Sequence, residues 1–143
     1  MKCTVIIDKS REEEVIVYAH SESDLTKKIE EAAKEGEVRL LGFREGEIVP
    51  LIPDDVICFS VVDGHVMAAT GNGKYRLRER LCAIEEVLPS DFVRINQSCI
   101  ANLRKILRFE ASYGGALRVV FKNGDVDYVS RRQLKNVKRR LGF

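Results

Sequence analysis

The most restrictive feature of this sequence is a succession of short apolar runs separated by glycine-containing turns, which begins near Pro53. The first runs and turns are residues 56–62, Asp63-Gly64, residues 66–70, Gly71-Asn72-Gly73 and residues 74–78. Asp-Gly and similar pairs adopt the positive φ angles that tight β-hairpin turns require. Because each run is short and bounded by turn residues, the pattern predicts antiparallel strands rather than helices.

The same pattern continues to the C-terminus, with two short helices inserted. Residues 80–88 place apolar side chains on one helical face, and Pro89 ends that helix. Asn123-Gly124 is the strongest short hairpin signal in the chain. The further expected elements are strands at residues 92–95, 106–110, 117–122 and 125–129 and a basic helix at residues 133–141. The sequence therefore predicts a mainly β protein with short helices, an α+β fold.

Residues 1–47 predict a separate, small βαβ-like unit. Residues 3–7 and 14–19 are β-branched runs, apolar residues recur at helical spacing after a cap at Ser21 or Ser23, and residues 38–43 form a third expected strand. The net charge is −4 in residues 1–47 and +6 in residues 48–143, which together give the +2 of the chain. We place the domain boundary near residue 48 and expect residues 1–47 to serve dimerisation or regulation.

The composition is that of a folded, water-soluble protein, with 45% hydrophobic and 32% charged residues. No run of apolar residues is long enough to span a membrane, and the N-terminus lacks a signal-peptide pattern, so we expect a cytoplasmic protein. The four cysteines lie far apart without a CxxC pair, and His20 and His65 are the only histidines. We therefore expect four small buried cysteines and neither a metal site nor a cofactor.

Polar side chains interrupt the strand pattern at Arg94-Ile95-Asn96-Gln97-Ser98. Asn and Gln can each make two hydrogen bonds to adenine, and Arg can make two to guanine. Burying these groups without partners is costly, so we expect Asn96 and Gln97 to face DNA. For Ser98 and Asn102 an alternative stays open, in which their side chains bond backbone groups of the turn. Arg94 is also assigned to the DNA-contacting set, and for its side chain too a structural role in the turn stays open.

Two other groups could contribute to the same surface. His65 follows a hairpin turn, where a histidine is either a solvated side chain or a groove contact. Ser130-Arg131-Arg132 follows the last expected strand, where a hydroxyl and two guanidinium groups can bind phosphates and bases. On the basic helix, Lys135, Lys138 and Arg139 share one face. The basic excess of the C-terminal two-thirds suits a nucleic-acid partner.

Several separated motifs occur in an order that resembles the LytTR DNA-binding domain family, over about residues 50–143. They are Phe92-Val93-Arg94-Ile95-x-x-Ser98-x-Ile100-x-Asn102, Lys105-Ile106, Lys122-Asn123-Gly124, Val129-Ser130-Arg131-Arg132 and the Leu88-Pro89-Ser90 end of a leucine-rich helix. The resemblance implies an elongated β-sheet domain in a bacterial transcription regulator. Such a domain has no recognition helix and places loop side chains in the grooves of DNA.

The resemblance also implies which positions contact DNA. The family's contact after its arginine-bearing strand corresponds to Asn96 and Gln97, and the arginine after the last strand corresponds to Arg131 and Arg132. The contact in the early hairpin falls near His65. The family's usual histidine or serine around Asn96 is replaced here, which could alter sequence preference.

The expected partners also follow from the resemblance. Family members commonly carry a receiver domain, whereas this chain resembles the stand-alone regulators, so control would act through a protein partner or through abundance. In the family such regulators are often encoded beside a small membrane protein thought to restrain them. We expect double-stranded DNA as the ligand, a homodimer at least on DNA, and a membrane protein as a regulatory partner.

Two other classes of protein are alternatives to a DNA-binding regulator. A β-rich interaction module could bind a protein or RNA, but single-stranded RNA favours exposed aromatic residues, and only 7% of this chain is aromatic, with no tryptophan. An enzyme would need a convergent set such as Cys99, His65 and an acid, whose local sequences lack a catalytic signature. We therefore expect a protein that is not an enzyme.

Overall fold

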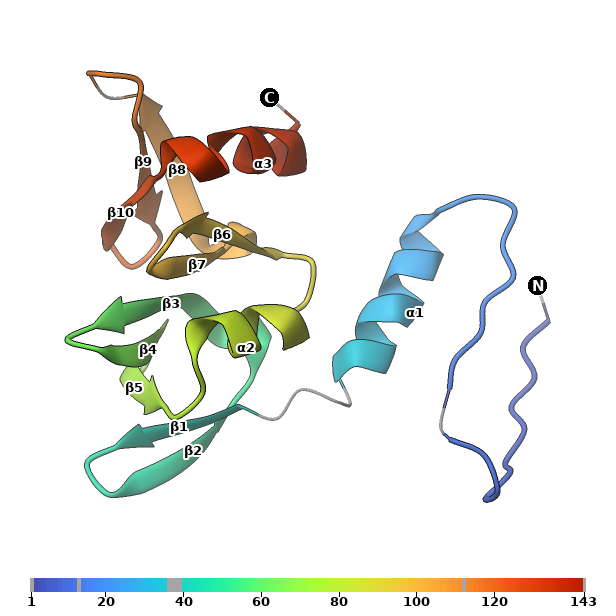
Figure 1. Cartoon of the computed structure of the whole chain (residues 1–143). Coiled ribbons are helices and arrows are strands. Elements are labelled where there is room, and N and C mark those ends of the chain that lie inside the picture. The colour runs from blue at the N-terminus through green and yellow to red at the C-terminus, as the bar shows by residue number, and fades with distance from the viewer. Residues whose placement is uncertain (1, 13, 36–39, 112, 143) are drawn as a thin grey trace. The chain divides into compact units, whose positions relative to one another are not determined.

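The computed structural model describes residues 2–12, 14–35, 40–111 and 113–142 (Figure 1). The chain forms two compact units, residues 1–36 and residues 37–143. The first contains helix α1, and the second contains all the strands of the described residues. The mainly β fold class predicted from the sequence is confirmed.

The N-terminal unit contains helix α1, Asp24–Glu35. Its start is fixed by Ser23, whose Oγ accepts a hydrogen bond from the Thr26 N–H at 3.3 Å while its own N–H donates to Thr26 Oγ1 at 2.9 Å. The two strands expected at residues 3–7 and 14–19 are wrong, since the described residues there form no ladder and are exposed. Their β-branched residues favour extended backbone, but two strands without a core to cover are marginal in water.

The second unit is built on a seven-stranded antiparallel sheet with the strand order β2-β1-β5-β4-β3-β7-β6. Its strands are β1 (Leu40–Arg44), β2 (Glu47–Leu51), β3 (Val56–Val62), β4 (His65–Thr70), β5 (Gly73–Leu77), β6 (Phe92–Asn96) and β7 (Cys99–Asn102). The third strand expected in the N-terminal unit forms, from Leu40 on, as β1. It pairs with β2 and β5, so it belongs to the β unit, which thus begins before residue 48.

A second, three-stranded sheet has the order β10-β9-β8. The remaining elements are η1 (Pro53–Asp55), α2 (Leu81–Val87), η2 (Leu103–Lys105), β8 (Ile106–Ala111), β9 (Leu117–Phe121), β10 (Val126–Val129) and α3 (Arg131–Leu141). On this sheet Glu110 accepts hydrogen bonds from Arg108 and Arg118, each at 2.7 Å. These bonds hold the pKa of Glu110 below its ordinary value.

The seven-stranded sheet lies between two hydrophobic cores, because neighbouring residues of a strand point to opposite faces. Phe59 and Ile100 lie in the core that also contains Ile84 of α2. Their chain neighbours Cys58 and Ala101 lie in the other core, with residues of the second sheet and α3 such as Val119, Phe121 and Val137. Each fully buried large side chain contributes about 1.5–3 kcal/mol. The double burial explains why β3 and β7 are apolar on both faces.

Hairpin turns form where the sequence predicts them. Asp63 and Gly64 have φ values of 50° and 78°, which match the turn type that two-residue hairpins prefer. In the β9–β10 turn, Gly124 has a φ of 88° and donates its N–H to the Phe121 carbonyl at 2.9 Å. Asn123 Oδ1 accepts the Asp125 N–H at 3.0 Å, which closes this turn locally.

The cysteines divide into two pairs. Cys58 and Cys99 are buried, whereas Cys3 and Cys82 are exposed, so the prediction of four buried cysteines is wrong for two of them. A hydrogen bond with Cys58, followed by burial, raises the pKa of the Cys99 thiol. Cys99 therefore stays neutral and serves as a small core residue.

Candidate nucleic-acid interface

The β6–β7 turn, Gln97-Ser98, is the centre of the polar segment identified in the sequence. Asn96 ends β6, and its Oδ1 accepts the Ser98 N–H at 2.8 Å, which forms a local Asx-type turn. The Ser98 carbonyl accepts the Val61 N–H of β3 at 2.9 Å. Gln97 and Ser98 are exposed. The turn thus presents the Gln97 side chain from a backbone that is fixed on both sides.

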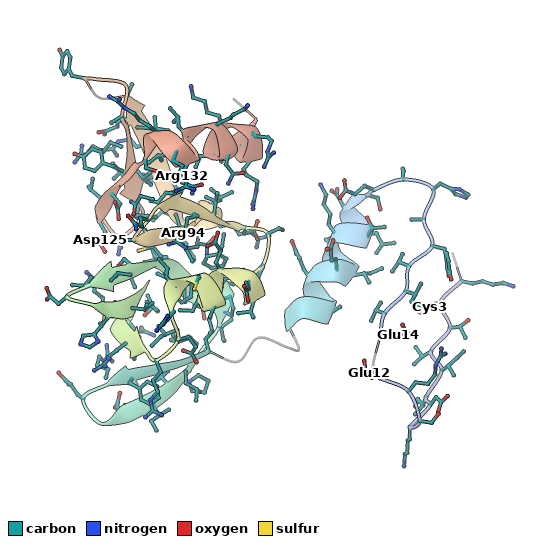
Figure 2. All side chains as sticks on the ribbon, viewed as in Figure 1. Cys3, Glu12, Glu14, Arg94, Asp125 and Arg132 are labelled. Carbon is teal, nitrogen blue, oxygen red and sulfur yellow. The ribbon has the colours of Figure 1, made fainter. Side chains whose placement is uncertain are left out.

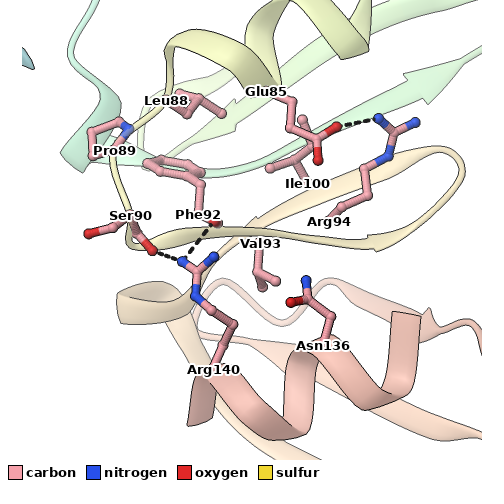
Figure 3. A pocket seen from close by; sticks show the side chains of 10 residues that line it. All are labelled: Glu85, Leu88, Pro89, Ser90, Phe92, Val93, Arg94, Ile100, Asn136 and Arg140. Carbon is pink, nitrogen blue, oxygen red and sulfur yellow. Dashed lines mark hydrogen bonds and ion pairs between the residues drawn. The ribbon is translucent and has the colours of Figure 1, made fainter. Parts of the chain in front are cut away.

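Arg94 lies behind this turn with its guanidinium group in three hydrogen bonds. Nε donates to the Asn96 carbonyl at 2.9 Å, and Nη2 donates to the Gln97 carbonyl at 2.5 Å. Nη1 forms an ion pair with Glu85 of α2 at 2.8 Å (Figure 3). The Arg94 side chain is 19% exposed. Three of its five N–H donors are thus directed to the protein itself, and Glu85 is a partner that sequence reasoning missed.

Asn96 joins the two sheets instead of projecting freely from the domain. Its Nδ2 donates to Asp127 Oδ1 at 2.9 Å and to the Tyr128 carbonyl at 2.8 Å, both in β10. Both amide hydrogens are therefore engaged, as is one acceptor site at Oδ1. Asp127 was also missed, although a carboxylate between Val126 and Tyr128 in a strand is a visible signal of an inward polar contact.

Asn102 is buried and has a structural role, which agrees with the capping alternative. Its Nδ2 donates to the Val56 carbonyl at 2.8 Å, and its Oδ1 accepts the Arg104 N–H at 3.1 Å at the start of η2. Within the described residues it is the one polar side chain of the buried class. Asn102 therefore connects the end of β7 to the start of β3.

Ser130 connects the last strand, helix α3 and β6. Its Oγ accepts the Gln133 N–H at 3.3 Å as the cap of α3, and its own N–H donates to the Ile95 carbonyl at 2.8 Å. The helix therefore starts at Arg131, two residues earlier than the sequence predicted. Arg131 and Arg132 are exposed in its first turn, and Figure 2 labels Arg132.

The remainder of α3 has a buried side and a basic side. Val137 is fully buried, and Arg140 donates to the Ser90 carbonyl and, at 3.3 Å, to the Phe92 carbonyl. These contacts attach α3 to β6 and the segment before it. Lys135, Lys138 and Arg139 are exposed, as their helical spacing predicted. The helix thus offers a cationic outer face on a firmly packed element.

His65 is exposed at the start of β4, where it pairs with Val62 across the β3–β4 hairpin. Ser60 near the end of β3 pairs with Cys99 at the start of the antiparallel strand β7. The β3–β4 hairpin, which follows β3, and the β6–β7 turn, which precedes β7, therefore lie at the same end of the sheet (Figure 1). The Ser130–Ile95 bond brings the start of α3 to that end as well. The structure therefore gathers the exposed candidates from three separate segments.

The described residues also bear on other kinds of site. They contain no group of three or more His, Cys, Asp or Glu side chains that could hold a metal ion. In the same part of the chain, no helix has the length and apolar character needed to cross a membrane.

The LytTr DNA-binding domain family model matches residues 46–142. The chain is 38% identical over 104 residues to an uncharacterized HTH-type transcriptional regulator of Staphylococcus aureus strain NCTC 8325 / PS 47, covering 73% of this chain and 71% of that protein. The same values hold for a regulator of strain MRSA252. A solved LytTr DNA-binding domain from Bacillus cereus superposes with a TM-score of 0.70 at 18% identity, covering 74% of this chain and 99% of that domain. The chain belongs to the LytTr DNA-binding domain family.

Proposed function

We propose that this DNA-binding regulator contacts double-stranded DNA with side chains gathered at one end of its seven-stranded sheet. The observation that carries the proposal is the convergence of three exposed segments, namely the β3–β4 hairpin, the β6–β7 turn and the start of α3. Each segment is fixed by backbone pairing or by a cap, so its side chains extend from a rigid scaffold. Rigid presentation lowers the cost of ordering on binding.

The proposed contacts divide by chemistry. Gln97, Arg131 and Arg132 have the amide and guanidinium groups that can make paired hydrogen bonds to base edges. His65 and Lys135 lie to either side of them in the chain and are suited to phosphates or to a second groove. Arg94, Asn96 and Ser98, which the sequence placed in the same set, contribute the bonds that shape the β6–β7 turn.

A helix-turn-helix arrangement is not needed for this mode of binding. In the described residues, strands separate α1, α2 and α3 from one another, so no two helices follow each other directly in the chain. The S. aureus relatives are named as HTH-type regulators. For this chain we propose instead that turn side chains and the first turn of α3 enter the grooves, as the family resemblance implies.

We further propose that the protein acts as a homodimer on DNA, because symmetric regulators bind paired half-sites. The N-terminal unit is the proposed site of dimer contacts or of a regulatory membrane-protein partner. Its described residues expose a set of large apolar side chains, which suits a surface that becomes covered. The exposed members are Val5, Ile6, Ile7, Val15, Ile16, Val17, Tyr18 and Leu25.

The direct test is selection of bound duplexes from a random DNA pool, followed by titration of the enriched site. Gln97→Ala and Arg132→Ala should each weaken binding by about 1–3 kcal/mol and relax specificity at one position. Arg108→Ala is the matched control, since it removes an exposed arginine from the β8 strand of the other sheet. Its binding should stay near that of the wild type.

Salt dependence gives an independent check. The logarithm of the association constant should fall linearly with the logarithm of salt concentration, with a slope set by the number of phosphate contacts. An association constant that does not change with salt concentration would contradict binding to duplex DNA. Tighter binding to single-stranded RNA than to any duplex would favour the alternative of a β-rich interaction module.

A further inference from the structure

We propose that Glu85 and Arg94 form a clamp that sets the shape of the β6–β7 turn, and that Arg94 acts as a positioning residue for Gln97 rather than as a DNA contact. The clamp consists of the Glu85 carboxylate, the Arg94 guanidinium group and the carbonyl groups of Asn96 and Gln97. The inference rests on the proposed function, because it concerns how the same surface is prepared for DNA.

The geometry of Arg94 is that of an internal support. A guanidinium group is planar, and its N–H groups have fixed directions, so its bonds to two successive carbonyls of the turn specify one backbone conformation. The ion pair between Arg94 Nη1 and Glu85 of α2 holds the guanidinium group in this orientation. Three of its five N–H groups are engaged in these bonds. A DNA contact that used the Nη1 donor now bound to Glu85 would take it from that carboxylate. Glu85 would then be an unpaired negative charge close to a phosphate backbone.

The turn is also held from the opposite side. Asn96 donates to Asp127 and to the Tyr128 carbonyl in the second sheet, and it accepts the Ser98 N–H. Gln97 therefore lies between two supports, one from α2 and one from β10. Its side chain is exposed and takes part in none of these bonds. The Gln97 side-chain amide therefore remains available to a base.

The ion pair borders a cavity of about 190 Å³ whose lining includes Glu85, Phe92, Arg94, Asn136 and Arg140 (Figure 3). The cavity is open, and the Glu85 side chain is 45% exposed. An ion pair in such a position adds little to overall stability. Substitution of Glu85 should therefore leave the fold intact while it loosens the turn, which separates positioning from folding.

The first experiment compares Glu85→Gln with Glu86→Gln, a neighbour on α2 that is exposed and carries the same charge. The readout is the ratio of affinities for the selected duplex and for a random duplex of equal length. Glu85→Gln should lower this ratio roughly two- to tenfold, the cost of ordering one side chain on binding, whereas Glu86→Gln should leave it unchanged. If Arg94 contacted DNA directly, Glu85 would compete for it, and Glu85→Gln would raise the ratio.

The second experiment is a double-mutant cycle of Arg94→Gln with Gln97→Ala on the selected duplex. If Arg94 acts through Gln97, the double variant should bind about as weakly as Gln97→Ala alone, with the salt slope of the wild type. Additive losses, with a slope reduced by about one unit, would identify a direct phosphate contact and overturn the proposal. Where Arg94→Gln fails to fold, the comparison of Glu85→Gln with Glu86→Gln decides.

Amide hydrogen exchange tests the clamp without DNA. Glu85→Gln should speed exchange at Ser98, whose N–H bonds within the turn, and Glu86→Gln should not. Equal exchange in both variants would overturn the clamp. If the wild-type protein selected no duplex at all, the proposed function would fail, and the exchange comparison would still decide whether the clamp exists.

Discussion

Substitution of Asn102 should destabilise the β unit far more than its small size suggests. Asn102 is fully buried, and its side chain makes one hydrogen bond to the Val56 carbonyl and accepts one from the Arg104 N–H. In Asn102→Ala both partners lose their bond, and Val56 is itself fully buried, so its carbonyl gains no access to water. The buried Val56 carbonyl left unpaired costs about 1–3 kcal/mol, and the lost bond of the part-buried Arg104 N–H about 0.5–1.5 kcal/mol, so the expected loss is about 1.5–4.5 kcal/mol.

The matched control is Asn123→Ala. Asn123 also makes two side-chain hydrogen bonds, to the carboxylate and from the N–H of Asp125, at 2.9 and 3.0 Å. It is exposed, so water can replace both partners, and the expected loss is below about 1 kcal/mol. The difference between the two stability losses measures the effect of burial, because both variants change Asn to Ala and both lose two side-chain hydrogen bonds.

The assay is urea unfolding of both variants and the wild type, with circular dichroism as the measured signal. A domain of this size is expected to have about 5–15 kcal/mol of stability, so Asn102→Ala should still fold. Its midpoint should fall while the slope of free energy against urea stays constant. A loss below about 0.5 kcal/mol, or losses that are equal for Asn102→Ala and Asn123→Ala, would refute the argument from burial.

Three further changes test other parts of the structure by the same unfolding assay. Gly42→Ala should cost about 1–3 kcal/mol, since its Cβ would lie 2.6 Å from the Cβ of Tyr75, and a neutral result would refute this close packing. Asn96→Asp removes the amide donor to Asp127 and to the Tyr128 carbonyl and places a second carboxylate beside Asp127, so it should lower the free energy of unfolding by about 1–3 kcal/mol; an unchanged value would contradict the link between the two sheets. The lowered pKa of Glu110 stabilises the fold above the unfolded pKa of the glutamate, and this stabilisation is lost as the pH falls through the folded pKa. Glu110→Gln should therefore lower the free energy of unfolding at neutral pH but not at low pH. An unchanged free energy of unfolding at neutral pH would contradict this.

Much of the β unit was predictable because its signals are local. The turn pairs Asp63-Gly64 and Asn123-Gly124 need particular backbone angles, and the strands on either side formed as expected. Strand β7 was missed, because Cys99-Ile100-Ala101-Asn102 has no alternation of apolar and polar residues. All four of its residues are buried, since it lies between two cores, and a strand buried on both faces loses the period-two pattern.

In the N-terminal unit the sequence predicted strands that do not form. Residues 3–7 and 14–19 have strong β propensity, yet the described residues there form no ladder. Propensity favours extended backbone but cannot provide a pairing partner or a core. Helix α1 was predictable because its cap and its amphipathic spacing are encoded within a dozen neighbouring residues.

At the candidate interface the sequence predicted residue types well and their exposure less well. Gln97, Arg131 and Arg132 are exposed as expected, whereas Arg94 and Asn96 bond to other parts of the protein. The partner of Asn96 lies 31 residues away in the chain, and that of Arg94 lies on another element. Polar residues can be recognised in a sequence, but their partners depend on the tertiary fold.

The bonds around the interface suggest how sequence preference could change without loss of the fold. Asn96, Ser130 and Arg94 connect strand ends and helix starts through backbone groups, so substitutions at these positions alter the scaffold. Gln97 and Arg132 are exposed, and their side chains make none of the hydrogen bonds by which Arg94, Asn96 and Ser130 hold the turn and the start of α3. Related domains with a different residue at Gln97 should therefore keep the same turn and bind different DNA, as long as their counterparts of Arg94 and Asn96 keep the supporting bonds.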